Sequence, residues 1–278
     1  MNTSRSHNSD DVSAVPSSPK IIYDLGANNG GDIPYYLKKA DLVVAVEANP
    51  SLCRQIRERF SSEVLDDRLR IENCVLVSEG HAAPEVSFYL HKRHHVLGQF
   101  PQPDKSVIAD YDKVLLPSQS AMQILRKHGD PYYIKIDIEH YDEVILKDLF
   151  RSGIKPPLIS AEAASIQVFA LLAGMGEYGA FKLVEGATVA KKYRNHAISV
   201  RGGIERYSFP PHSAGPLGDD IAGDWMNADD FFEVLAAKKP GWRDIHATNL
   251  VQPDPVSRVQ KRNYMLRHMR GWLKGKLQ

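Results

Sequence analysis

Cysteine is almost absent from the sequence, since Cys53 and Cys74 are the only two among 278 residues. Two thiols cannot form a disulfide framework, and their spacing matches no metal-binding motif. Free thiols fit a reducing compartment, so we expect a cytoplasmic protein. The first twenty residues are polar and contain no apolar stretch of the kind found in a signal peptide, which agrees with that expectation.

Long apolar runs and an excess of charge of one sign are lacking as well. No uninterrupted apolar segment is long enough to cross a bilayer. The 35 lysine and arginine residues nearly balance the 34 aspartate and glutamate residues, which leaves a formal net charge of +1. A balanced chain has no global positive field to attract phosphates, so we expect no nucleic-acid partner.

Short apolar, β-branched segments alternate with amphipathic ones, and the former predict strands while the latter predict helices. The predicted strands are 20–25, 41–48, 68–77, 85–92, 132–139 and 156–163. The predicted helices are 31–40, 49–60, 118–129, 141–150 and 165–176. Such alternation predicts a mainly parallel sheet that is covered by helices on both faces. We expect 181–186 and 196–202 to close the sheet as an antiparallel pair.

Composition divides the chain into regions around this pattern. Residues 1–19 are rich in Ser, Asn, Asp and Pro, so we expect a disordered tail. Residues 20–200 carry the alternating pattern. Residues 201–255 are rich in Gly, Pro, His and Asp, and long irregular stretches in compact domains are often functional lids. We therefore expect 201–255 to be an ordered appendage on the side of the sheet where a substrate binds.

Residues 256–278 carry seven lysine or arginine residues and no acid, with apolar residues at helical spacing. We expect a basic C-terminal helix here. It could bind an anionic membrane surface. We favour packing on the protein body or on a second subunit of a homo-oligomer, because Gly271 and Gly275 weaken an isolated helix.

A turn rich in glycine and asparagine follows the first predicted strand, in "IIYDLGANNGG". Ligands of open α/β sheets bind beyond the carboxyl ends of the strands. Gly26 and Gly30 let the backbone approach a ligand. The carboxylate of Asp24 would repel a pyrophosphate, and the G-x-G-x-x-G pattern of dinucleotide sites is absent. Both facts argue against a nucleotide-dependent oxidoreductase and favour S-adenosylmethionine, which carries a sulfonium, an ammonium and no phosphate.

Glu47 ends the second predicted strand, 23 positions after Asp24. An acid at this place accepts hydrogen bonds from the ribose hydroxyls of a cofactor. The simpler interpretation is that Asp24 caps its own loop and that Glu47 is merely exposed.

Two more acids, Asp137 and Glu139, end the strand in "YYIKIDIEHYDEVIL". Alone they would be charges that complement a helix N-terminus. In combination with the other strand ends, the sequence resembles the FkbM family of S-adenosylmethionine-dependent methyltransferases. That family shows D-x-G-A-N-x-G, E-x-N-P, I-K-I-D-x-E-G and a strand that ends in Glu. The matching segments are Asp24–Gly30, Glu47–Pro50, Ile134–Glu139 and Leu158–Glu162.

The resemblance covers roughly residues 20–200 and implies a class I, Rossmann-like α/β methyltransferase fold with a mainly parallel seven-stranded sheet. It also implies O-methylation of a hydroxyl on a small molecule or glycan, such as a sugar or polyketide; a carboxylate or amine acceptor is the alternative. By the same resemblance, the turn after the first strand would hold the methionine part of S-adenosylmethionine, and Glu47 would hold its ribose. Asn73 or Cys74 would lie near the adenine. The implied cofactor-binding residues are Asp24, Gly26, Ala27, Asn28, Glu47, Ala48, Asn73, Cys74 and Asp137.

An aliphatic hydroxyl needs a general base or a metal ion to take up its proton. The candidate catalytic residues are Asp137, Glu139, His140, Glu162 and His212. Asp137 and Glu162 end adjacent strands and could together bind Mg²⁺, although Glu162 could instead pair with a basic side chain. Without a metal, a histidine could be the base, the candidates being His94, His95, His140 and His212.

His140 stands where the family usually has glycine, which changes the backbone freedom of that turn. A second departure is the stretch after residue 200. We expect its segment 208–226 to fold over the acceptor, with polar side chains that contact hydroxyls and Trp225 as a flat apolar face. The polar residues in question are His212, Ser213, Asp219 and Asp220. The alternative is a surface loop that holds the C-terminal helix.

Overall fold

The computed structural model describes residues 18–238 and 241–253. The predicted N-terminal tail, except for its last two residues, and the predicted basic helix 256–278 lie outside this part of the chain. Within it, no helix combines the length and the apolar character needed to cross a bilayer.

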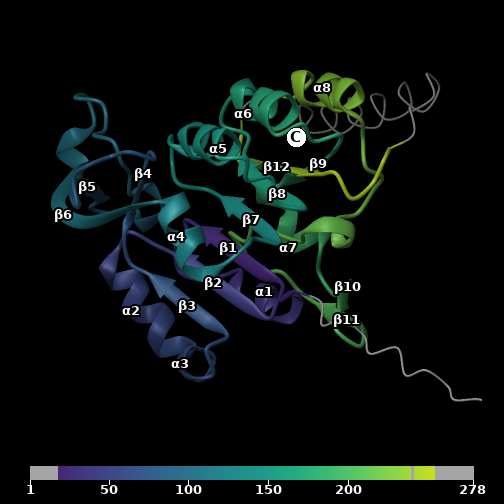
Figure 1. Cartoon of the computed structure of the whole chain (residues 1–278), viewed down its shortest axis with the longest axis horizontal. Coiled ribbons are helices and arrows are strands. Elements are labelled where there is room, and N and C mark those ends of the chain that lie inside the picture. Colours follow the sequence, from purple (N-terminus) through teal and green to yellow (C-terminus); the bar gives the residue numbers. More distant parts are fainter. Residues whose placement is uncertain (1–17, 239–240, 254–278) are drawn as a thin grey trace, which may run out of the picture.

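A seven-stranded sheet forms the centre of the molecule (Figure 1). β12 runs antiparallel to both of its neighbours, β8 and β9, whereas the other adjacent strands are parallel. The predicted α/β fold with a mainly parallel seven-stranded sheet is therefore confirmed. The strands, in spatial order, are β3 (Leu69–Glu72), β2 (Leu42–Val46), β1 (Ile21–Leu25), β7 (Tyr133–Ile136), β8 (Leu158–Glu162), β12 (Arg243–Thr248) and β9 (Ala180–Glu185).

Helices cover both faces of this sheet, because its central strands are apolar on both sides. On one face a large apolar cluster joins the sheet to α4 (Ala121–His128), α5 (Asp142–Arg151), α6 (Ile166–Ala170) and α8 (Ala228–Ala236). On the other face a second cluster joins it to α1 (Ile33–Lys39), α2 (Pro50–Arg59) and α7 (Val189–Lys192). The remaining short helices are α3 (Ser61–Leu65), η1 (His95–Leu97), η2 (Ile108–Asp110), η4 (Gly186–Thr188) and η5 (Gly218–Asp220), together with the π-helical turn η3 (Leu171–Met175).

Helix ends follow from local side chains. The Asn49 side chain accepts a hydrogen bond from the Ser51 backbone N–H at 2.9 Å, and Pro50 occupies the first position of α2, as predicted. At α4, Ser120 and Gln123 form a capping box, and Gly129 ends the helix at φ 110°.

The predicted strand 68–77 is wrong as one element, because it divides between two sheets. Its first half is β3, and its second half, β4 (Val75–Val77), belongs to a three-stranded sheet with β6 (Tyr111–Ser120) and β5 (Glu85–His91). The sequence did not predict β6. Much of it is exposed, so its pattern of apolar side chains is weak, and its last residues had been assigned to the following helix.

The predicted pair of 181–186 with 196–202 is also wrong. β9 pairs with β12, whereas β10 (His196–Val200) forms a separate two-stranded ribbon with β11 (Gly203–Tyr207). β12 comes from the expected appendage 201–255 and lies between β8 and β9. The sheet therefore extends past residue 200, where the alternating pattern had suggested that the methyltransferase domain ends.

Candidate active site

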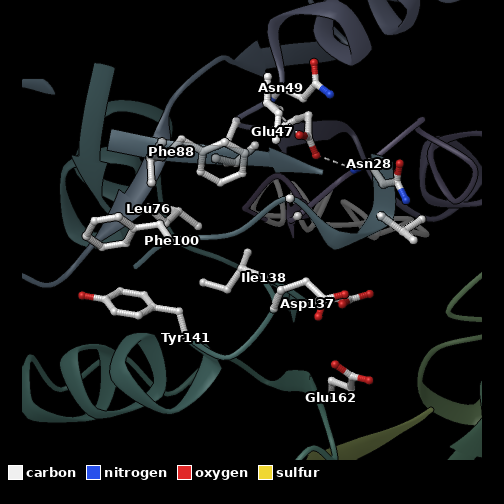
Figure 2. A pocket seen from close by; sticks show the side chains of 18 of the residues that line it. Asn28, Glu47, Asn49, Leu76, Phe88, Phe100, Asp137, Ile138, Tyr141 and Glu162 are labelled. Atoms are coloured by element: carbon white, nitrogen blue, oxygen red, sulfur yellow. Dashed lines mark hydrogen bonds between the residues drawn. The ribbon is translucent and has the colours of Figure 1, made fainter. Parts of the chain in front are cut away.

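A cavity of about 320 Å³ lies at the carboxyl ends of β1, β2, β7 and β8 (Figure 2). Its polar wall comes from these strand ends and the turns that follow them. Its apolar wall comes from β4, β5 and the loop after β5, with Leu76, Phe88 and Phe100 at its surface. This is the sheet edge at which ligands of open α/β folds bind.

The turn after β1 passes very close to the end of β7. Gly26 has φ 93°, and a Cβ atom at this residue would lie 1.8 Å from the Asp137 carbonyl oxygen. The backbone N–H groups of Gly26 and Ala27 both donate to the Val46 carbonyl oxygen, at 3.0 and 2.9 Å. The turn is thus fixed to β2 and β7, and only glycine fits at residue 26.

Glu47 lies at the end of β2 and lines the cavity, on the same side as Asn28 (Figure 2). One of its carboxylate oxygens accepts the Asn28 N–H at 2.8 Å and the other accepts the Asn49 N–H at 2.7 Å. Burial raises the pKa of the Glu47 carboxyl to about 7. Each oxygen can accept a further hydrogen bond, so a diol placed in the cavity could contact both.

Asp24 does not line the cavity; it lies beneath it with 1% of its surface exposed. The Lys135 Nζ atom is 3.3 Å from Asp24 Oδ1, 3.3 Å from Asp137 Oδ2, and 3.4 Å from the Gly26 carbonyl oxygen. Burial raises the pKa of the Asp24 carboxyl to about 6, and the Lys135 ammonium opposes that rise. Asp24 thus contacts a buried ammonium directly below the site.

Lys135 was not among the site residues predicted from the sequence. Its signal was a lysine within the otherwise apolar strand "YYIKI", since a buried lysine needs an acidic partner. Strand register supplies that partner, because Lys135 pairs with Asp24 across β1 and β7. Parallel neighbours in register present their side chains on the same face of a sheet.

The other predicted cofactor residues divide into two groups. Gly26, Asn28, Ala48, Cys74 and Asp137 line the cavity with Glu47. Ala27 is instead buried in the apolar cluster beneath α1. The Asn73 side-chain amide donates to the carbonyl oxygens of Glu47 and Ala48, at 3.0 and 2.9 Å, so Asn73 holds the backbone after β2 in place.

Of the predicted catalytic residues, Asp137, Glu139, Glu162 and His212 line the cavity. His140 is exposed and does not. Glu139 and His140 have φ 47° and 65°, a left-handed conformation that costs a residue other than glycine about 1–2 kcal/mol. The family's glycine position is therefore strained in this chain, and strained backbone is common at functional sites.

The remaining histidine candidates give no further support to a histidine base. His94 is exposed and is not among the residues that line the cavity. The side chain of His95 lies outside the described part of the structure.

Carboxylates crowd the end of the cavity near β7 and β8. Burial raises the pKa values of Glu139 and Glu162 to about 7, and repulsion from Asp137 adds to the rise in both. Asp244 lies directly opposite Glu162 in the β8–β12 pair and is 1% exposed. Burial, with repulsion from Asp137, raises the Asp244 pKa well above its usual range.

The structure gives no support to Mg²⁺ at Asp137 and Glu162. The described residues contain no group of three or more His, Cys, Asp or Glu side chains arranged to hold a metal ion. The Lys135 ammonium, 3.3 Å from Asp137 Oδ2, already supplies a positive charge at this carboxylate.

Most of segment 208–226 packs on α1. Ser213 Oγ and the Ala214 N–H donate to the Asp32 carboxylate, the second at 3.0 Å. Asp220 Oδ2 accepts hydrogen bonds from Tyr35 Oη at 2.7 Å and from Lys39 Nζ at 2.8 Å.

Trp225 and Asp219 of this segment, which were also expected to contact the acceptor, contact each other instead. Trp225 donates to Asp219 at 3.1 Å and lies 4.6 Å from the Lys182 ammonium. His212 reaches the cavity, where its ring lies 6.0 Å from that of Trp242 at an angle of 21°. The segment mainly covers one face of the sheet and contributes His212 to the site.

A pH dependence follows from the raised pKa of Glu162. Because its carboxyl holds a proton more tightly in the folded chain than its usual pKa of 4.5 would allow, the stability that this proton provides is lost as pH rises through about 7. We expect Glu162→Gln to become progressively more stable than the parent as pH rises from about 5 to 8. Thermal unfolding across this range measures the difference.

Glu58→Gln is the matched control, because Glu58 is exposed on α2. Its melting temperature should follow that of the parent throughout. A constant difference between Glu162→Gln and the parent across the range would contradict the assignment.

No protein-family model and no curated protein matches the sequence. Solved structures show limited similarity to the chain. The methyltransferase FkbM from Methylobacillus flagellatus KT superposes with a TM-score of 0.41 and 16% identity, over 60% of this chain and 40% of that one. The chain thus spans less than half of that protein's length.

Two other similar structures cover more of this chain at lower scores. The precorrin 8w decarboxylase from Methanobacterium thermoautotrophicum gives a TM-score of 0.38 and 11% identity over 84% of both chains. An S-adenosylmethionine-dependent O-methyltransferase from Thermotoga maritima gives 0.35 and 9%, over 84% of this chain and 61% of that one. The strand order of the central sheet follows from the strand pairing within this chain and does not depend on these similarities.

Proposed function

We propose that the chain is an S-adenosylmethionine-dependent methyltransferase that methylates a hydroxyl of a small molecule or glycan. The observation that carries this proposal is the charge of the cavity. Its described lining includes four carboxylates, those of Glu47, Asp137, Glu139 and Glu162, and neither lysine nor arginine. Such a site attracts a cofactor with a sulfonium and an ammonium, and it repels the pyrophosphate of a dinucleotide.

The cavity has a suitable surface for each part of this cofactor. The close turn at Gly26 and Asn28 would hold the methionine part, and the two oxygens of Glu47 would accept the ribose hydroxyls. The adenine would lie towards Cys74 and Ile138, where the lining becomes apolar. Asn73, which the sequence placed near the adenine, would act by fixing the loop that carries Glu47.

Once bound, the cofactor would supply a methyl group on a sulfonium with a neutral leaving sulfur. The protein then has to align the acceptor oxygen with this methyl group, and alignment of this kind contributes about 7–11 kcal/mol. Glu162 and His212 both line the cavity and could take the acceptor's proton. We assign that role to Glu162, because its pKa of about 7 suits a base that works near neutral pH.

The same charges favour some of the alternative acceptors and partners over others. An acceptor carboxylate would enter a site that already holds four carboxylates, and nucleic-acid phosphates would be repelled in the same way. A hydroxyl or an amine meets no such repulsion. We therefore propose a neutral or cationic small-molecule acceptor.

Calorimetric titration with S-adenosylmethionine, S-adenosylhomocysteine and NAD tests the proposal. We expect binding of the first two and none of NAD. Glu47→Gln should weaken the binding of both about tenfold or more, because it removes charge-assisted hydrogen bonds to the ribose, each of which contributes about 1.5–3 kcal/mol.

Glu58→Gln, on the exposed side of α2, should bind both cofactors like the parent. Binding of NAD in preference to S-adenosylmethionine, or unchanged affinity in Glu47→Gln, would reject this use of the site.

A further inference from the structure

Two carboxylates of the cavity are left without partners by the proposed cofactor contacts. Glu47 accepts two backbone N–H groups and Asp137 lies beside Lys135. Glu139 and Glu162 also line the cavity, yet within residues 18–238 and 241–253 neither of their carboxylates makes a hydrogen bond or an ion pair. Figure 2 shows Glu162 at the opposite end of the site from Glu47, with Asp137 between them.

A third acidic side chain lies behind this end of the cavity. Asp244 lies directly opposite Glu162 on β12, so the two side chains share one face of the sheet. Asp244 is 1% exposed, and both of its carboxylate oxygens lack a hydrogen-bond partner in the described structure. Like charges directly opposite each other in an antiparallel pair are destabilising, so this pair requires a proton or a cation beside it.

An aromatic ring lies at the same end of the cavity. Trp242 is two residues before Asp244, and its indole packs against Gly186, where a Cβ atom would meet ring atoms at 2.2–2.6 Å. The ring lines the cavity together with His212. Carboxylates beside an indole are the groups with which proteins bind organic cations.

We propose that Glu139, Glu162 and Trp242 form a subsite for a protonated amine of the methyl acceptor, which would make the acceptor a hydroxyl compound that also carries an ammonium group. This inference rests on the proposed function and names its substrate class. The ammonium would bind Glu139 and face the indole, while the hydroxyl would lie beside Glu162. Asp244 is too deeply buried to touch the acceptor; an ammonium bound near it would favour the ionised form of its carboxyl.

Other ligands fit the subsite less well. A metal ion would require a set of ligands that the described residues do not form. An anionic acceptor would be repelled by the carboxylates of Glu139 and Glu162. A neutral polyol would leave these carboxylates uncompensated in a partly buried site, whereas an ammonium neutralises them and replaces the hydration that they lose.

Three ring compounds of one shape test the proposal: aminocyclohexanol, cyclohexanediol and hydroxycyclohexanecarboxylate. Each carries a hydroxyl at one ring position, and the opposite position carries an ammonium group, a second hydroxyl or a carboxylate. Their binding to the protein in complex with S-adenosylhomocysteine is measured by ligand-observed NMR at about pH 8. This pH lies above the pKa of about 7 of Glu139 and Glu162, and the amine is still protonated there. We expect the amine to bind at least tenfold more tightly than the diol and the carboxylate compound not to bind.

Variants of Glu139 and Glu162 test whether these residues cause the preference for the amine. Glu139→Gln should remove most of the preference for the amine over the diol, and the double variant Glu139→Gln/Glu162→Gln should remove all of it. Glu58→Gln should keep it in full, because Glu58 is exposed on α2. S-adenosylhomocysteine lacks the sulfonium, and its proposed contacts are with Glu47 and the turn after β1. Its affinity, measured in the same samples, should therefore stay within a few-fold of the parent in all variants.

The two proposals fail differently. If S-adenosylhomocysteine does not bind the parent, the proposed function fails. If it binds, and the three compounds then bind equally, none of them binds at millimolar concentration, or the preference for the amine survives in the double variant, the amine subsite is wrong while the cofactor site stands.

Discussion

Gly26→Ala should abolish cofactor binding and destabilise the fold. A methyl group at this residue would lie 1.8 Å from the Asp137 carbonyl oxygen and 2.8 Å from the Asp137 carbonyl carbon. No rotamer relieves that contact, because both atoms belong to the backbone. The turn after β1 would have to move away from β7, and it would carry Asn28 away from Glu47.

The loss of stability in Gly26→Ala has two causes, which a control variant can separate. A left-handed backbone costs alanine about 1–2 kcal/mol, and overpacking costs a further 1–3 kcal/mol or so. Gly80 has a similar φ of 86°, against 93° for Gly26, but nothing lies within 4 Å of a Cβ atom there. Gly80→Ala should therefore lose only the roughly 1–2 kcal/mol that the left-handed backbone costs, and it should keep its cofactor affinity.

Denaturant unfolding and calorimetric titration measure both effects. Gly26→Ala should lose about 2–5 kcal/mol of unfolding free energy and, where it still folds, at least 100-fold in affinity for S-adenosylhomocysteine. Equal stability losses in Gly26→Ala and Gly80→Ala, with affinity retained in both, would show that the close contact is not needed for the site.

The sequence predicted correctly those elements of the fold that are determined by neighbouring residues in the chain. Asn49 and Pro50 predicted the start of α2, and the apolar runs predicted the parallel strands around β1. β12 was missed because its place between β8 and β9 is set by pairing with strands that lie about 60 to 85 residues earlier in the chain. Non-local pairing of this kind leaves little trace in a local pattern of apolar residues.

The candidate site, too, could be predicted from the sequence only in part. The ends of strands can be predicted from the sequence, so the carboxylates at the ends of β1, β2, β7 and β8 were found. What the sequence could not give is which of them face the cavity. Asp24 lies beneath it because strand register brings Lys135 alongside, and Asp244 stands opposite Glu162 only because β12 inserts where it does. Register is a property of the assembled sheet.

Lys135→Met should have the largest effect on stability among changes at a side chain of the site. The Lys135 side chain is 5% exposed, and its ammonium lies 3.3 Å from the carboxylates of both Asp24 and Asp137. Burial alone would lower its pKa, yet the charges of Asp24, Asp137, Asp32 and Asp244 hold it well above the usual value. Removal of this ammonium leaves buried carboxylates uncompensated, which costs about 3–5 kcal/mol.

The loss of stability in Lys135→Met should become larger as pH increases. The pKa of Asp24 is already raised to about 6 with Lys135 opposing the rise, so it should rise further without that ammonium. A carboxyl whose pKa is raised on folding stabilises the folded chain when protonated and loses that contribution as pH increases. Lys135→Met should thus be closest to the parent at about pH 5 and fall furthest behind it at about pH 8.

Lys182→Met is the matched control for the loss of a buried lysine. Lys182 is 5% exposed, but its ammonium donates to the Ile221 carbonyl oxygen at 2.7 Å, so its removal leaves no carboxylate unpaired. A second variant, Lys135→Met with Asp24→Asn, should regain part of the lost stability at about pH 8, because it removes one of the charges that Lys135 neutralises. If Lys135→Met and Lys182→Met lost equal stability at every pH, and Asp24→Asn gave no rescue, the buried ammonium would not be what holds the carboxylates beneath the cavity.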